Sequence, residues 1–177
     1  MKRYLFLILF MLVAGCGEPT ETEMHRHEPQ TISDADECAV CGMSVMNHPG
    51  PKGQLYLVGS QQPAKFCSTV DFFIYALQPE HENRIAMGYV HDMSGADWQT
   101  PDGAAFIAAK DAWFVIGHEL PGAMGPTLAS FAKQAAAQAF IDEHGGRLLR
   151  YQEIDLQVLQ ELHEAGFKAD GASRHHY

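Results

Sequence analysis

The middle of the chain alternates between short apolar segments and turn residues, a pattern typical of strands and short helices. Residues 54–58 and 64–67 predict the two strands of a hairpin, entered through a turn rich in Gly and Pro. Ser68 and an acidic residue three positions later form a capping-box pattern, which predicts a helix over residues 68–77. Residues 84–92 alternate between apolar and polar positions and predict a third strand.

A second series of elements repeats this order. Strands are predicted at residues 104–109, 112–116 and 147–151. An Ala-rich stretch with apolar residues on one face predicts a helix over residues 126–144, with a proline at its first position. A last short helix is expected over residues 155–164. The sequence therefore predicts an α+β protein in which strand, strand, helix, strand occurs at residues 54–92 and again at 104–151.

The N-terminus has the pattern of an export signal. Two basic residues precede a ten-residue apolar run at positions 4–13, which is too short to cross a bilayer core. The segment Val13-Ala14-Gly15-Cys16 resembles a bacterial lipobox, in which the cysteine becomes the lipidated first residue. Gly17 follows, and by resemblance to sorted lipoproteins this favours the outer membrane. The alternative is a plain secreted protein with a chance cysteine at the cleavage site.

The remaining chain divides by composition. Residues 17–37 are polar and acidic with few apolar positions, so we expect a flexible tether between the membrane and the domain. The predicted divisions are a signal peptide at residues 1–15, a lipidated tether at 16–37, a folded domain at 38–166 with subdomains at about 38–95 and 96–166, and a flexible tail at 167–177.

The charge argues against one class of partner. Twelve basic residues stand against 22 acidic ones, a net charge of −10, and removal of Lys2 and Arg3 with the signal leaves −12. Nucleic-acid binding needs a basic patch to neutralise phosphates, so we expect no nucleic-acid partner. An acidic domain suits a basic partner or a cation.

The number of cysteines indicates that at least one thiol stays free for a functional reason. Export places the domain in an oxidising compartment, where free thiols are at risk. With Cys16 used for lipid, Cys38, Cys41 and Cys67 remain, and an odd number leaves at least one outside any intramolecular disulfide. Metal binding is one reason to keep such a thiol.

The densest chemical signal lies at residues 38–48. Cys38, Cys41, Met43, Met46 and His48 offer two thiols, two thioethers and an imidazole within eleven residues. Thiolate and thioether are soft ligands that select Cu(I), and Met is not among the usual zinc ligands. If the backbone is extended, side chains two apart point the same way, so Cys41 and Met43 present both sulfurs to one side.

Other interpretations of these residues stay open. Cys38 and Cys41 have the spacing of a redox dithiol, although the turn residues that follow do not resemble the helix start that such motifs use. Cys38, Cys41 and Cys67 with a His have the ligand count of a structural zinc site. The two methionines also suit simple core packing.

Several linked motifs together resemble the NosL family of lipoprotein copper chaperones for nitrous oxide reductase assembly. The likeness covers residues 38–154 and the lipobox. The motifs are the run Cys41-Gly-Met-Ser-Val-Met-Asn-His48-Pro-Gly-Pro-Lys-Gly-Gln54, the segments Tyr89-Val-His-Asp-Met93 and Trp113-Phe-Val-Ile-Gly117, the Met124-Gly125 pair and the Gly145-Gly146 turn.

The resemblance implies a fold of two consecutive ββαβ units with antiparallel sheets and helices packed on one face. It implies a Cu(I) site on Cys41 and Met43, with Met124 at the family's Met-Gly position as a further sulfur ligand. It also implies delivery of copper to an ABC-type membrane complex and on to nitrous oxide reductase, by a periplasmic protein anchored through its N-terminal lipid.

Further ligand candidates and the lack of catalytic motifs complete the expectations. His48 and His91 are nitrogen alternatives for the copper site. Cys38 and Cys67 are spare thiols, further ligands or a disulfide pair. No G-x-S-x-G, H-E-x-x-H or P-loop pattern occurs in the sequence, so we expect a protein that is not an enzyme. Asp71 and His118-Glu119 stand isolated in the sequence, and we expect solvated side chains there.

Overall fold

The computed structural model describes residues 27–173. The predicted signal peptide, the lipid attachment at Cys16, the first part of the tether and the last four residues lie outside this range. Within it, no helix combines the length and the apolar character that crossing a membrane requires.

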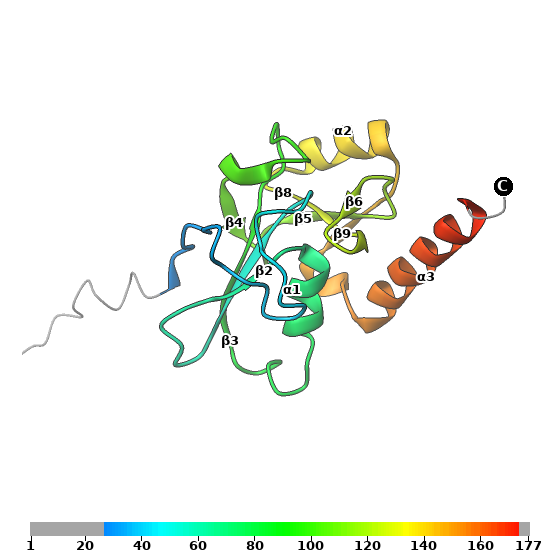
Figure 1. Ribbon diagram of the computed structural model, residues 1–177. Coiled ribbons are helices and arrows are strands. Elements are labelled where there is room, and N and C mark those ends of the chain that lie inside the picture. Colours follow the sequence, from blue (N-terminus) through cyan, green and yellow to red (C-terminus); the bar gives the residue numbers. More distant parts are fainter. Residues whose placement is uncertain (1–26, 174–177) are drawn as a thin grey trace, which may run out of the picture.

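The first ββαβ unit forms an antiparallel sheet covered by a helix. Its strands are β1 (Gly53–Leu57), β2 (Ala64–Phe66) and β3 (Ile85–His91), and helix α1 (Thr69–Ala76) connects β2 to β3. Strand β4 (Phe106–Ala108) pairs with the outer edge of β3, which gives the strand order β2-β1-β3-β4 (Figure 1).

The second unit repeats the arrangement. Strands β5 (Trp113–Ile116), β8 (Ala129–Phe131) and β9 (Arg147–Arg150) are antiparallel in the order β8-β5-β9, and helix α2 (Gln134–His144) connects β8 to β9. In both units the first strand is central, with the second strand on one side and the third on the other. The predicted α+β fold with two consecutive ββαβ units is confirmed.

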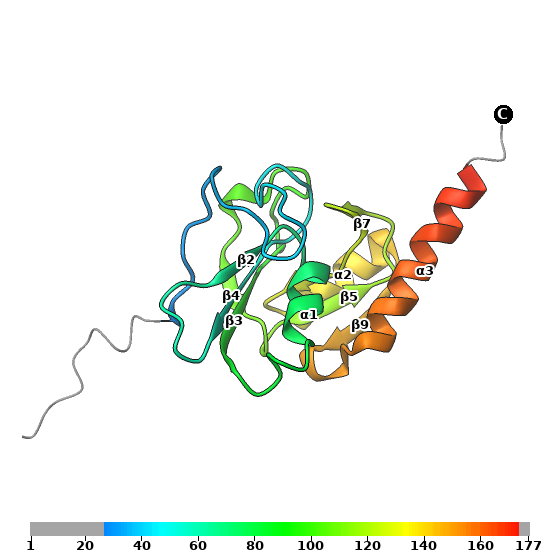
Figure 2. The same ribbon diagram turned by 60° about the horizontal axis from the view of Figure 1, so that its bottom comes forward.

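The remaining elements connect or extend these units. They are the hairpin of β6 (Pro121–Gly122) and β7 (Gly125–Pro126), the short helices η2 (Pro101–Gly103) and η3 (Tyr151–Glu153), and helix α3 (Leu156–Ser173). Helix α3 packs against α1 and β7 and extends away from the domain (Figure 2). The prediction that the last helix ends at residue 164 is wrong, because Gly166 lies within a longer helix.

Two predicted elements were assigned wrongly. Residues 104–109 were expected to open the second unit, but β4 belongs to the first sheet. The expected helix over residues 126–144 begins only at Gln134, because residues 129–131 form β8 and pair with β5. Phe131 is buried in that strand rather than on a helix face.

Helix α1 lies between the two sheets (Figure 2). Phe72 packs on the first sheet, where its ring fills the space above Gly53 and Gly88. Phe73 faces the second sheet, with its ring centroid 5.2 Å from that of Phe114. Strand β5 is apolar at every position because Phe114 and Ile116 face this shared core, whereas Trp113 and Val115 face α2. The two units therefore share one hydrophobic core.

The outer face of the first sheet is covered by the segment of residues 28–32. Tyr56 donates a hydrogen bond to the Glu28 carbonyl oxygen at 2.7 Å. Gln54 exchanges hydrogen bonds with the backbone of Gln30, and the Gln54 side chain is fully buried. The expectation of a flexible tether up to residue 37 is therefore wrong for these residues, because the folded region begins about ten residues earlier.

Removing one of these contacts is expected to have a small, measurable cost. Tyr56→Phe deletes the hydroxyl that reaches Glu28 and leaves the rest of the ring in place. We expect the free energy of unfolding to fall by about 1 kcal/mol, the usual net value of such a hydrogen bond. Urea unfolding of the two proteins at equal pH measures it. An unchanged midpoint would mean that this segment does not contribute to stability.

Candidate metal centre

The end of β2 and the start of α1 place two potential ligands together. Cys67 follows the last residue of β2, and Ser68 is the N-cap of α1. The Ser68 hydroxyl accepts from the backbone N–H of Asp71 and also lies 3.1 Å from Oδ2 of that residue. This capping arrangement turns the Asp71 carboxylate back toward the strand, where Oδ2 lies 3.1 Å from the Cys67 sulfur.

A tight loop brings two more thiols to the same place. The backbone N–H of Cys38 donates to the Met43 carbonyl at 2.8 Å, and that of Gly42 donates to Cys38 at 2.9 Å. Gly42 has a φ of 72°, a conformation that glycine adopts without strain. The backbone N–H of Ala39 donates to the carbonyl of Lys65 in β2 and holds the loop against the end of that strand. Figures 1 and 2 both show the loop beside α1.

Three thiols and one carboxylate converge in this cluster. The potential ligand atoms of Cys38, Cys41, Cys67 and Asp71 all lie within 4.8 Å of one another. The Cys41 and Cys67 sulfurs are 3.5 Å apart, and the Cys38 sulfur lies 3.6 Å from the Asp71 carboxylate. All three thiols are free. Cys38, Cys67 and Asp71 are buried, whereas Cys41 is only partly buried and forms the open side.

The cluster is electrostatically prepared for a cation. A hydrogen bond from the Cys67 thiol, with others from the backbone N–H groups of Cys41 and Val40, lowers the pKa of Cys38. That same hydrogen bond, together with burial, raises the pKa of Cys67, and burial raises the pKa of Cys41 and of Asp71. Acidic groups that retain protons only because they are crowded and buried release them when a metal ion binds.

A buried lysine, Lys52, connects the segments that carry the cluster. Its side chain is fully buried, and its ammonium group donates to the carbonyls of His48, Pro49 and Cys67 at 2.5, 3.3 and 3.2 Å. These hydrogen bonds join the segment after the Cys41 loop to the end of β2. The positions of the cysteine sulfurs therefore depend on a buried charge that sequence reasoning did not single out.

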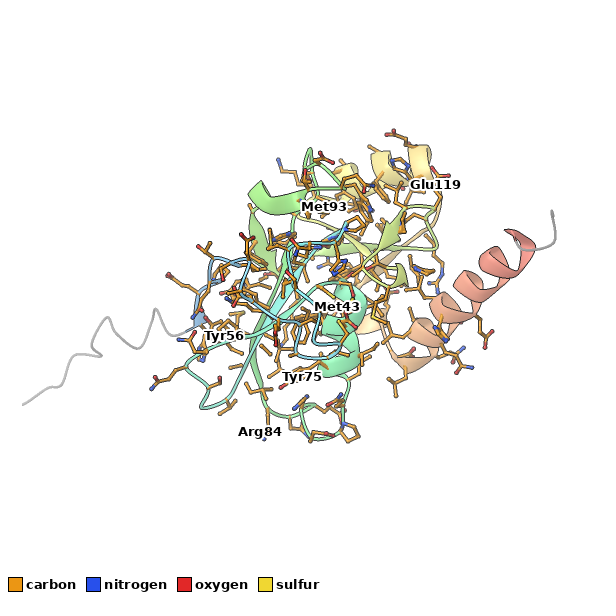
Figure 3. All side chains as sticks on the ribbon, viewed as in Figure 1. Met43, Tyr56, Tyr75, Arg84, Met93 and Glu119 are labelled. Carbon is orange, nitrogen blue, oxygen red and sulfur yellow. The ribbon has the colours of Figure 1, made fainter. Side chains whose placement is uncertain are left out.

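The structure places the other predicted ligands in different surroundings. Met43 is partly buried and packs against the core that contains Cys38 and Cys67 (Figure 3). Neither His48 nor His91 belongs to the group that converges within 4.8 Å. Met124 lies in the β6–β7 hairpin with 69% of its surface exposed, and it lines a cavity of about 430 Å³ that none of the cysteines lines.

Asp71 is the member that sequence reasoning missed. It was expected to be solvated, but it is buried and in contact with Cys38, Cys41 and Cys67. The signal that could have found it is the spacing from Cys67 to Asp71 across a helix N-cap. Cys67 lies one residue before the N-cap and Asp71 three residues after it, so the two side chains lie at the same end of the helix.

Two buried histidines make stability depend on pH. Burial lowers the pKa of both His91 and His118 to about 4, with further lowering by Lys52 at His91 and by His144 at His118. The folded protein thus binds fewer protons than the unfolded chain between about pH 6.5 and 4, so stability is complete above 6.5 and falls as the pH falls through this window.

The expected loss for each histidine is about 2 kcal/mol between pH 7.5 and 5. Urea unfolding at the two pH values measures the sum. His118→Phe keeps an aromatic ring between Trp98 and Phe140, whose rings flank His118 at 5.2 and 5.1 Å. We expect this variant to lose about half as much stability on acidification. A loss equal to that of the parent protein would contradict the assignment to His118.

Fold and site together define a class. Two ββαβ units hold a buried set of three thiols and a carboxylate that is open on the side of Cys41, which is the arrangement of a protein that binds a soft metal ion. A family model described as NosL matches residues 29–159. The chain belongs to the NosL family.

Individual relatives agree with this assignment. The chain is 45% identical over 157 residues to the copper-binding lipoprotein NosL of Stutzerimonas stutzeri, covering 89% of this chain and 81% of the relative. It is 37% identical over 152 residues to the protein of the same name from Achromobacter cycloclastes, covering 84% and 77%. The crystal structure of the copper chaperone NosL from Shewanella denitrificans matches with a TM-score of 0.71 and 44% identity, covering 73% of this chain and 97% of that one.

Proposed function

We propose that the protein is a membrane-anchored Cu(I)-binding metallochaperone of the periplasm and is not an enzyme. The observation that carries this is the convergence of Cys38, Cys41 and Cys67 in a buried cluster. Cu(I) is a soft ion that prefers thiolate ligands. The relatives are named copper-binding lipoproteins and a copper chaperone. Lipid on Cys16 is the proposed anchor, and Gly17 favours the outer membrane.

The ligands divide into a buried part and an accessible part. Cys38 and Cys67 are inside the protein, and Cys41 is at its surface end. Met43 follows Cys41 by two residues and is the proposed thioether ligand, with Met124 as a further sulfur donor. His48 and His91 stay as nitrogen alternatives. Asp71 supplies an oxygen and a negative charge behind the sulfurs.

An open side is what a delivery protein needs. A partner that presents its own soft ligand can reach the metal at Cys41 before the buried thiols let it go, so the ion passes between proteins without being free. A binding group carried by a surface loop suits such an exchange. The net charge of −12 after signal removal would help to steer the domain toward a basic partner surface.

The proposed recipient is nitrous oxide reductase, reached through an ABC-type membrane complex. This proposal is supported by the family to which the chain belongs and by the motifs from Cys41 to Gln54 that carry the likeness.

An anaerobic competition titration tests copper binding. The reduced full chain, purified in detergent, is titrated with Cu(I) against a colorimetric Cu(I) chelator, and a parallel titration uses Zn²⁺ with a zinc indicator. We expect one tightly bound Cu(I) per chain. Failure to compete for Cu(I) would exclude the chaperone, and tight binding of Zn²⁺ alone would indicate a zinc-stabilised module that uses the three cysteines and Asp71.

A further inference from the structure

The three thiols of the cluster are not equivalent. The Cys41 and Cys67 sulfurs lie 3.5 Å apart. The Asp71 carboxylate contacts all three sulfurs, at 3.1 Å for Cys67, 3.6 Å for Cys38 and 4.0 Å for Cys41. A disulfide bond is about 2.05 Å long, so the Cys41 and Cys67 sulfurs need to approach by about 1.5 Å to form one. Cys41 is also the thiol that is partly exposed to solvent.

Of the two cysteines, Cys41 is the one whose backbone is placed to move toward the other. Cys67 is fully buried between β2 and α1 and is held there through its carbonyl by Lys52. Cys41 lies instead on a surface loop, between Val40 with 38% of its surface exposed and the exposed Gly42. Apart from the two chain neighbours, no atom lies within 4 Å of where a Cβ at Gly42 would stand, so the loop faces open space at Gly42. Closure would therefore bring the exposed Cys41 loop toward the buried Cys67.

From this geometry we propose that Cys41 and Cys67 are a site of covalent modification, which forms an intramolecular disulfide in the metal-free protein and thereby closes the copper site. The inference rests on the proposed function, since it concerns the same cluster. It differs from a redox dithiol of Cys38 and Cys41, because it joins the partly exposed Cys41 to Cys67, whose sulfur lies 3.5 Å away although the two residues are far apart in sequence.

The reaction is a two-step thiol–disulfide exchange with a small-molecule disulfide. The Cys41 thiol loses its proton and attacks one sulfur of the oxidant, which forms a mixed disulfide and releases the first thiol. The Cys67 thiol then loses its proton, attacks the Cys41 sulfur and releases the second thiol. Two protein thiols are oxidised to one disulfide, and the oxidant is reduced to two thiols that carry the two protons.

Copper and the disulfide exclude each other. The oxidised protein keeps only Cys38 of the three thiols in the cluster, so one thiolate instead of three is available beside the proposed thioethers. Bound Cu(I) in turn occupies the sulfur of Cys41, which is the accessible thiol for the first attack. By linkage, a ligand that binds the reduced form alone protects that form against oxidation.

The experiment maps the disulfide in the unaltered protein. The full chain in detergent is equilibrated with reduced and oxidised glutathione, with and without one equivalent of Cu(I), and free thiols are blocked with N-ethylmaleimide. Non-reducing digestion and mass spectrometry identify the linked peptides. We expect a Cys41–Cys67 link with Cys38 alkylated, and disulfide formation at least about tenfold slower when Cu(I) is bound. A predominant link from Cys38 to either cysteine, or no link, would overturn the proposal.

Variants and a separate titration keep this test apart from copper binding itself. Cys67→Ser should abolish the link, and Cys38→Ser, the matched control, should retain it. Oxidised protein should bind Cu(I) at least about 100-fold more weakly than reduced protein, with recovery after reduction. Equal affinity of the two forms would contradict closure of the site. If reduced protein fails to bind Cu(I) while the Cys41–Cys67 link forms, the chaperone function fails and the modification site stands.

Discussion

Cys67→Ser is expected to weaken Cu(I) binding by at least about 100-fold. Loss of a group that merely supports a metal ligand commonly costs 10–100-fold, so removal of a soft ligand itself should cost at least the upper end of that range. Serine keeps the size and polarity of the side chain, and its oxygen is a hard donor that Cu(I) disfavours. The same competition titration measures the change, with circular dichroism to check that the variant is folded.

A comparison of variants separates the loss of a copper ligand from a general loss of folded structure. Cys41→Ser should have an effect similar to that of Cys67→Ser, and Met43→Leu a smaller one that still exceeds that of Met93→Leu. Met93 is the matched control because it is buried in the second core cluster, apart from Met43 (Figure 3). Equal Cu(I) affinities of the Met43 and Met93 variants would remove Met43 from the ligand set. An unchanged affinity for Cys67→Ser would remove Cys67.

Phe72→Ala is expected to lower the free energy of unfolding by about 3–5 kcal/mol. Its fully buried ring fills the space above Gly53 and Gly88, and it stands edge-on to Phe66 and Phe73 with centroids 5.7 and 5.2 Å away. The two glycines have no side chains that could fill the cavity left by truncation, and such unfilled cavities account for the upper part of the usual range. Urea or thermal unfolding of the metal-free protein measures the loss.

The control for this prediction lies on the same helix. Ile74 is 37% exposed, so Ile74→Ala should cost clearly less than Phe72→Ala. A loss of about 1 kcal/mol or less for Phe72→Ala would show that the sheet and the helix collapse onto each other freely. Because Asp71 precedes Phe72 in α1, we also expect Cu(I) affinity to fall in Phe72→Ala but to be unchanged in Ile74→Ala.

Local patterns in the sequence predict most of the elements but not how they pair. The strands at β1, β2, β3, β5 and β9 lie within two residues of their predicted bounds, since each is a short apolar or alternating run between turn residues. Strand β8 was missed because Pro126 and the Ala-rich run beyond it favour a helix locally, whereas pairing with β5 decides the conformation of residues 129–131.

The residues of the candidate site also fall into those that local sequence predicts and those that long-range contacts bring in. Cys41, Met43 and Cys38 are close in sequence, so spacing and ligand softness point to them directly. Cys67 and Asp71 come from the far end of a hairpin, and their approach to the loop depends on the hydrogen bond between Ala39 and Lys65 and on the buried ammonium of Lys52. Contacts between distant segments leave no periodic signal in one sequence, and this is why Asp71 was taken for a solvated residue.

The segment of residues 28–32, which covers the first sheet, would limit how far the domain can move from the proposed lipid anchor. A chain of extended residues reaches at most about 3.6 Å per residue, so a free tether from Cys16 to residue 37 would allow roughly 75 Å. Because Glu28 and Gln30 are fastened to Tyr56 and Gln54, the free length from the proposed lipid ends near residue 27. The corresponding upper limit is about 40 Å, so a domain anchored at the proposed lipid would stay close to the membrane, which would favour the proposed membrane-embedded partner over a soluble one.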